Sequence, residues 1–208
     1  MNRFFSVLSK KRPTDKPIII VSGLPRSGTS MMMKMLAEGG LQIVTDDVRR
    51  ADDDNPNGYF ELETVKSLPE GNFTWLKKAN GKVVKIISSL LEYLPSHYTY
   101  EVIFMERELK EILASQKKML TNRNESAKLD DAEMEQRFRN HLVAIKAWLI
   151  RQANIKVFYV NFTSLIADPK TLCNQISEFI DIPLDLDRMI SVPTEKLYRN
   201  RAVMEKKP

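Results

Sequence analysis

The chain has 208 residues, 43% of them hydrophobic and 28% charged, which is the composition of a globular domain large enough to bury a core. Its single cysteine excludes an internal disulfide and a cysteine-cluster metal site. A formal net charge of +5 suits an anionic substrate and weak binding to nucleic acid equally, so charge alone does not choose between them.

Residues 1–16 form the first segment, in which a short apolar patch precedes a basic run. A secretory signal has its charges before its apolar run, so this order predicts a cytoplasmic protein. No apolar run approaches the roughly 20 residues that a membrane-spanning helix needs. We therefore expect a flexible leader over residues 1–16, one domain over 17–191 and a basic tail over 192–208.

The domain opens on a strand, a glycine loop and a helix. Four apolar, mostly β-branched residues at 18–21 predict a strand buried on both faces, and the pattern over 29–36 predicts a helix. Gly23 and Gly28 bound the loop between them. Such a loop aims unpaired backbone N–H groups and the positive end of the helix dipole at one point, which predicts an anion site that usually takes a phosphate.

The glycine spacing fits the phosphate-loop pattern with one departure, because Thr29 stands where nucleotide kinases carry a lysine. That lysine normally reaches the β- and γ-phosphates, so its absence argues against a nucleoside triphosphate. Arg26 instead brings a guanidinium into the loop, and Ser27, Thr29 and Ser30 add hydroxyl donors. An ordinary strand-to-helix turn without a ligand is the alternative interpretation. Such a turn does not explain why an arginine and three hydroxyl groups converge there.

A polar stretch at 45–61 follows a short apolar piece at 41–44 that predicts a second strand. Long polar loops in compact domains usually carry function. The stretch ends in Tyr59, Phe60 and Glu61, and two adjacent aromatic rings need somewhere to pack. We interpret it as a substrate-side loop, with a solvated connector as the alternative.

Residues 83–87 predict a buried strand that is interrupted by Lys85. Burying an ammonium group costs several kcal/mol unless the group meets an anion. We therefore place Lys85 at the carboxyl end of the strand, where open parallel sheets bind ligands. A lysine that extends to water at the sheet edge is the alternative.

A further strand is expected at 102–105 and a helix at 109–120, with Arg107 between them and Ser115 on the helix. Eight residues span roughly 12 Å along an ideal helix axis, so this spacing alone does not place both side chains on one ligand. The later sequence predicts an amphipathic helix at 132–152, a strand at 156–160 and a helix at 170–180.

The string GLPRSGTS at 23–30 resembles the loop that binds the 5′-phosphosulfate in sulfotransferases that use 3′-phosphoadenosine 5′-phosphosulfate (PAPS). Arg107, with Ser115 eight residues later, resembles the element that binds the 3′-phosphate in the same family. The resemblance covers about residues 17–183. It implies a P-loop-like α/β fold of three layers, α/β/α, with a central parallel sheet built from right-handed crossovers.

The resemblance also implies a reaction, in which PAPS gives its sulfuryl group to an acceptor hydroxyl or amine without a metal, leaving 3′,5′-bisphosphoadenosine (PAP). Arg26 and the loop amides would hold the 5′-phosphate, and Lys85 would stabilise the bridging oxygen or the sulfuryl group. The implied cofactor-binding residues are Arg26, Ser27, Gly28, Thr29, Ser30, Arg107 and Ser115. The expected partner is a small-molecule or carbohydrate acceptor, with no nucleic acid and no integral membrane segment.

Such a reaction needs a base for the acceptor's proton. Many relatives carry a histidine two residues after the strand lysine, but Ile87 stands there in this chain. Other branches of the family use a carboxylate. Glu61 is the best candidate, and Asp47 and Asp53 are the runners-up.

Two other classes of protein stay open. A phosphate-loop nucleotide kinase would need a lysine where Thr29 stands and a carboxylate to hold magnesium. A non-catalytic nucleotide-binding protein would share both phosphate sites and lack a base, which fits the missing histidine. No motif identifies the acceptor.

Overall fold

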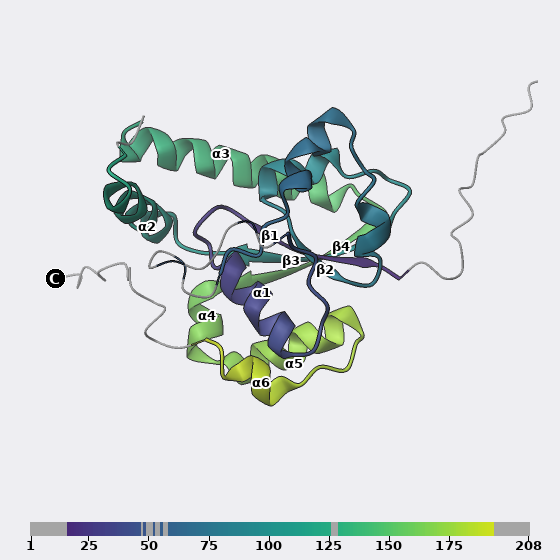
Figure 1. Ribbon diagram of the computed structural model, residues 1–208. Helices are drawn as coiled ribbons and strands as arrows, with labels where there is room; N and C mark the ends of the chain where they lie inside the picture. Colours follow the sequence, from purple (N-terminus) through teal and green to yellow (C-terminus); the bar gives the residue numbers. More distant parts are fainter. Residues whose placement is uncertain are drawn as a thin grey trace, which may run out of the picture.

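The computed structural model describes residues 16–46, 48, 52, 55, 58–125 and 129–193. Within this part of the chain, parallel strands form one four-stranded sheet in the order β2-β1-β3-β4 (Figure 1). The strands are β1 (Ile18–Gly23), β2 (Val83–Lys85), β3 (Tyr100–Glu106) and β4 (Ile155–Asn161). The expected leader and tail lie almost wholly outside the described residues, as do Asp47 and Asp53.

The inner strands β1 and β3 are almost entirely buried because helices cover both faces of the sheet. Every residue of β1 is buried, and in β3 only the last residue is partly exposed. Ile20 of β1 lies opposite Val84 of β2 and Val102 of β3. Since all four strands run in the same direction, their carboxyl ends meet at one edge of the sheet, where parallel sheets bind their ligands.

Two layers of helices enclose the sheet (Figure 1). One face is covered by α1 (Thr29–Glu38), α4 (Phe162–Ala167), α5 (Pro169–Ile180) and α6 (Leu186–Ile190). The other face is covered by α3 (Asp131–Ile150) and the 3-10 helices η1 (Glu63–Glu70), η2 (Leu76–Ala79) and η3 (Ser88–Tyr93). α2 (Leu109–Asn122) packs on α3, and the two form an arm beyond the sheet. The expected three-layer α/β/α fold is confirmed.

No helix in the described part of the chain is long and apolar enough to cross a membrane. The longest, α3, has 20 residues and exposes most of its side chains to water. Its apolar stripe faces the 3-10 helices and the sheet, as Ile145 and Leu149 are both buried there. This is the burial that the amphipathic pattern over 132–152 predicts.

Residues 41–44 do not form the strand that their apolar character predicts. Ile43 makes an isolated parallel bridge to Val83 and no longer ladder. The chain leaves the sheet at Thr45, whose Oγ1 donates a hydrogen bond to the backbone oxygen of Glu61 at 2.9 Å. This bond ties the start of the loop at 45–61 to its end, so the pairing stops where the loop begins.

Candidate active site

The loop between β1 and α1 has the backbone of a phosphate loop. Gly28 caps α1 in the left-handed conformation (φ 103°), and no side chain caps this end of the helix. A Cβ atom at Gly28 would lie 2.5 Å from Cδ2 of Phe162, so only glycine fits between the loop and α4. The resulting helix N-terminus, with Thr29 and Ser30, lines a cavity of about 470 Å³.

Arg26 joins the two motifs that lie far apart in the sequence. Its backbone has a positive φ of 69°, which is uncommon for a residue with a side chain. Its Nε donates a hydrogen bond to Oγ of Ser115 on α2 at 2.9 Å. Its carbonyl oxygen accepts one from Nη1 of Arg107 at 3.4 Å. The glycine loop and the β3–α2 segment therefore form one cationic cluster.

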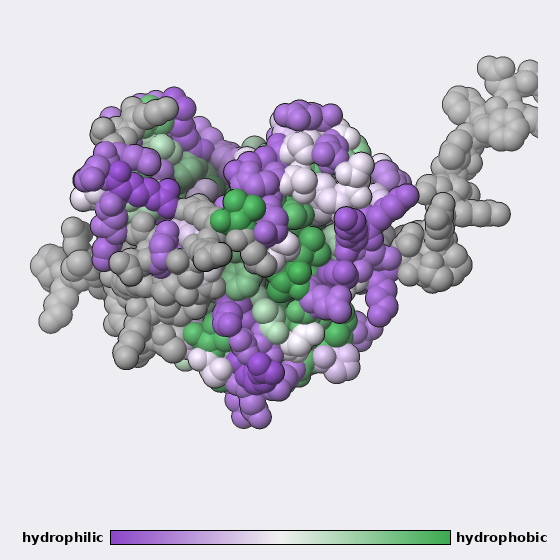
Figure 2. Space-filling model, viewed as in Figure 1, coloured by the Kyte–Doolittle hydropathy of each residue, from purple (hydrophilic) through white to green (hydrophobic). Residues whose placement is uncertain are grey.

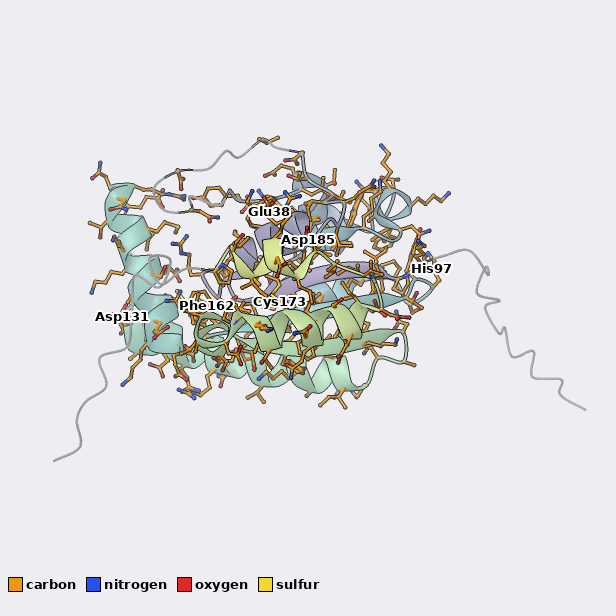
Figure 3. All side chains as sticks on the ribbon, turned by 90° about the horizontal axis from the view of Figure 1, so that it is seen from below. Glu38, His97, Asp131, Phe162, Cys173 and Asp185 are labelled. Atoms are coloured by element: carbon orange, nitrogen blue, oxygen red, sulfur yellow. The ribbon has the colours of Figure 1, made fainter. Side chains whose placement is uncertain are left out.

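Arg107 is fixed from two sides at the start of α2. Its Nε donates to Oε2 of Glu111 at 2.9 Å, and both side chains are buried, with 6% and 2% of their surface exposed. Its guanidinium carbon lies 4.3 Å from the centre of the Phe162 ring, in cation–π geometry. Figure 3 shows Phe162 on the side of the molecule where α3 begins at Asp131. Glu111 is not among the predicted site residues, although its i,i+4 spacing from Arg107 is a recognisable signal.

Lys85 ends β2 and points into the same cavity, with 8% of its side chain exposed. Its Nζ donates to the backbone oxygen of Tyr59, lies 3.5 Å from Oγ of Ser30 and 3.7 Å from Oε1 of Glu61. Ser30 also accepts a hydrogen bond from Nδ2 of Asn55 at 2.8 Å. The loop at 45–61 thus meets the helix N-terminus and the strand lysine at one point.

The end of this loop is itself anchored. The Tyr59 ring is 5% exposed, and its hydroxyl lies 2.7 Å and 2.8 Å from the two carboxylate oxygens of Asp52. Nη2 of Arg123, just after α2, lies 3.5 Å from the same hydroxyl. The preceding backbone turn places Glu61 with its side chain 30% exposed, so the carboxylate faces Lys85 and stays open to a ligand. Tyr59 and Arg123 are lining residues that the sequence analysis did not single out as site residues.

Ser27 lies apart from the other expected site residues. It is 1% exposed, and its Oγ has no hydrogen-bond partner among the described residues. It lines a separate cavity of about 200 Å³ together with Glu106 and Arg107. The larger cavity is lined by the remaining expected residues, namely Arg26, Gly28, Thr29, Ser30, Glu61, Lys85, Arg107 and Ser115.

The larger cavity has the charge and size for an anionic small molecule. Its volume falls in the range of about 300–1,000 Å³ that is typical of ligand sites. Among its described lining residues, Glu61 is the one carboxylate. The cationic lining residues are Arg26, Lys66, Lys85, Arg107, Lys118 and Arg123. No three metal-binding side chains gather in the described part of the chain.

Solved structures share this architecture. The crystal structure of mouse sulfotransferase SULT7A1 complexed with PAP matches with a TM-score of 0.56 and 14% sequence identity, over 95% of this chain and 70% of that one. The chain has the sulfotransferase fold. The sulfotransferase domain of the olefin synthase from Synechococcus PCC 7002 has the same fold, with a TM-score of 0.52, 15% identity, and coverage of 93% of this chain and 86% of that one.

No protein-family model and no curated protein matches the sequence. The sulfotransferase fold is therefore established here by the arrangement of the elements and not by sequence identity. That fold confirms the class of structure that the two short motifs predict.

Proposed function

We propose that this protein is a sulfotransferase that moves a sulfuryl group from PAPS to an acceptor hydroxyl or amine. The observation that carries the proposal is the 2.9 Å hydrogen bond between Arg26 and Ser115, with Arg107 on the Arg26 carbonyl. It joins the segment expected to bind the 5′-phosphosulfate to the one expected to bind the 3′-phosphate. One adenosine with phosphates at both positions would satisfy both segments at once.

The helix N-terminus and the guanidinium of Arg26 suit the 5′-phosphosulfate end of the donor, because both favour negative charge. Arg107 and Ser115 suit the 3′-phosphate. Arg107 is already oriented by Glu111 and Phe162, so little side-chain entropy is lost when it meets an anion. The cavity would supply fixed donors to a reaction that depends on positioning and charge stabilisation more than on covalent chemistry.

The sulfuryl group would pass from PAPS to the acceptor in the space between the side chains of Glu61 and Lys85. The acceptor oxygen forms a bond to sulfur while the bond between sulfur and the 5′-phosphate oxygen breaks, and PAP leaves with that electron pair. Glu61 takes the acceptor's proton, and Lys85 stabilises the charge that develops on the bridging oxygen or the sulfuryl group. The 3.7 Å between the two side chains and the part exposure of Glu61 support these roles.

Replacing Glu61→Gln tests the proposal, because it removes the base and keeps the shape of the side chain. We expect loss of transfer by a factor of about 100 or more, with the affinity for PAP nearly unchanged. PAP release in the presence of acceptors measures the first quantity, and calorimetric titration with PAP measures the second. Full activity of this variant would remove Glu61 from the role.

Glu63→Gln is the matched control. Glu63 lies two residues further on, is half exposed, and pairs with Lys66 at the surface. The substitution removes the same charge from the same segment without touching the contact to Lys85. We expect its transfer rate to stay within about twofold of the wild type.

The kinase alternative is less well supported. The carboxylate that ends β3 is Glu106, which pairs with Lys146 and lines the smaller cavity. It therefore lies apart from Lys85 and from the helix N-terminus of the larger cavity. A thermal-shift comparison of PAP with ATP plus magnesium separates the two classes, and we expect stabilisation by PAP alone. If no acceptor tested led to PAP release from PAPS, a non-catalytic binding protein would instead be favoured.

A further inference from the structure

Two segments that contribute reactive groups to the larger cavity also contribute its apolar wall. Glu61 is followed by Leu62 and Val65, and all three line the cavity. Lys85 is followed, in the same way, by Ile87 and Leu90. Each segment thus presents a polar group and two apolar side chains to the same space, and the exposed Lys66 adds a cation at the end of the first segment.

This apolar wall, made of Leu62, Val65, Ile87 and Leu90, is firmly supported from behind. Leu62 and Leu90 pack against the hydrophobic core, and Val65 is part of it. The 3-10 helices η1 and η3, which begin just after Leu62 and Ile87 and contain Val65 and Leu90, contact each other. Figure 2 shows a notch in the surface between the α2–α3 arm and the 3-10 helices, with hydrophobic surface at its base.

Ile87 is the exposed member of the wall, with 41% of its surface accessible. It follows Lys85 by two residues, so it lies beside the group that would stabilise the transferred sulfuryl. An accessible isoleucine at that distance offers an acceptor's body an apolar contact and no hydrogen bond. Besides Lys66 on η1, the polar lining residues include Gln116 and Lys118, which come from α2 next to Ser115.

We propose that the acceptor is an alcohol or phenol carried on an apolar body, and not a free sugar. The proposal rests on the proposed sulfotransferase function. An apolar body gains free energy when Leu62, Val65, Ile87 and Leu90 exclude water from it. A carbohydrate placed against the same wall would lose the hydrogen bonds between its hydroxyl groups and water, and the apolar side chains would not replace them.

To test this inference, the wild-type protein is incubated with PAPS and with two kinds of acceptor. 4-Butylphenol and 1-octanol represent apolar bodies, and methyl glucoside and glucosamine represent sugars. Sulfated products are detected by mass spectrometry. We expect kcat/KM for the apolar acceptors to exceed that for the sugars by about 100-fold. Preference for methyl glucoside or glucosamine would overturn the inference and leave the sulfotransferase function standing.

Ile87→Ser tests the wall directly, since an exposed position accepts a hydroxyl without unfolding the protein. We expect KM for 4-butylphenol to rise about tenfold, because a contact of this size contributes that much to binding, while the affinity for PAP stays unchanged. Ile150→Ser is the control, as Ile150 is 83% exposed and lies at the end of α3 outside the cavity lining. Equal KM values in both variants would overturn the role of Ile87.

A binding measurement separates failure of this inference from failure of the proposed function. Calorimetric titration of 4-butylphenol into the PAP-loaded protein needs no turnover. Binding that Ile87→Ser weakens about tenfold supports the apolar site. Such binding without any sulfated product would overturn the sulfotransferase function, while no binding of either apolar probe would overturn the inference.

Discussion

A buried carboxylate beside Arg107, the arginine that we propose binds the 3′-phosphate, is unexpected on charge grounds, because it offsets part of the attraction for an anion. The Glu111–Arg107 pair is nevertheless almost fully buried and has good geometry. Since Arg107 also stacks on Phe162, the carboxylate determines the direction in which the remaining N–H groups point. We infer that Glu111 is a positioning residue.

Glu111→Gln should therefore have two separable effects. The variant loses a charge-assisted hydrogen bond in a buried site, and we expect about 1.5–3 kcal/mol less stability in urea unfolding. We also expect weaker binding of PAP but unchanged binding of adenosine 5′-phosphate, which lacks the 3′-phosphate. A purely structural role would leave the ratio of the two affinities as it is.

The matched control is Glu133→Gln on α3. Glu133 pairs with Arg137 in the same i,i+4 spacing at 2.8 Å, but the two side chains are 48% and 64% exposed. Water screens a pair of this kind, so we expect less than about 0.5 kcal/mol of lost stability. A loss as large as that of Glu111→Gln would contradict the role of burial.

Among the elements, the β1–α1 loop depends on the missing side chain of Gly28 for its contact with α4. Gly28→Ala should cost stability twice, once for the positive φ and once for the contact with Phe162 at 2.5 Å. Because the clash moves α4 or the loop, we expect PAP affinity to fall by at least tenfold. Thermal unfolding and calorimetric titration measure the two effects.

Gly40→Ala measures the cost of the positive φ alone. Gly40 follows α1 with a φ of 99°, close to that of Gly28, and no atom lies within 4 Å of an added Cβ. We expect this variant to lose about 1 kcal/mol and to bind PAP normally. Equal loss of affinity in both variants would show that backbone strain, and not the contact with Phe162, governs the loop.

The sequence predicts long periodic elements well and short irregular ones poorly. The strand expected at 102–105 lies within β3, and the helix expected at 132–152 differs from α3 by one residue at its start and two at its end. Residues 41–44 have the right composition for a strand, but Thr45 turns away to bond Glu61. The 3-10 helices have no such periodic pattern, and η1 contains Pro69, so the sequence analysis did not find them.

The residues of the candidate site likewise divide into those that the sequence predicts and those that it does not. Arg26, Lys85 and Arg107 are recognisable because each stands beside a strand end, where a parallel sheet places its ligands. Tyr59 is not, because its contacts to Asp52 and Arg123 depend on how a loop folds back. The pair of Ser88 and His141, 2.8 Å apart, joins η3 to α3, and no spacing in the sequence indicates it.

At the scale of the whole molecule, the single cysteine, Cys173, can be used to follow unfolding. It is fully buried on α5 (Figure 3), and burial raises the pKa of its thiol to about 11. At pH 8 we therefore expect a disulfide reagent to modify the native protein at least 100-fold more slowly than the urea-unfolded chain. PAP should slow the reaction further if the thiol is exposed by global unfolding.

An Ile150→Cys variant gives the reference rate of an exposed thiol on the same fold, since Ile150 is 83% exposed. The raised pKa of the Cys173 thiol also determines how the stability of the protein changes with pH. Below about pH 9 the thiol is protonated in both states, and its contribution to stability is lost as the pH rises towards 11. Fast modification of native Cys173 at pH 8 would show that α5 opens by itself.

The central strands β1 and β3 are neighbours in space although α1, η1, η2, β2 and η3 separate them in the chain. During synthesis on the ribosome, Arg26 leaves the exit tunnel long before Arg107 and Ser115 exist. The nucleotide of the proposed function would consequently not guide the early steps of folding, because its binding site would be assembled only when distant contacts close. It can only stabilise the finished product, so scarcity of the nucleotide in a cell should lower the lifetime of the mature chain and not its rate of maturation.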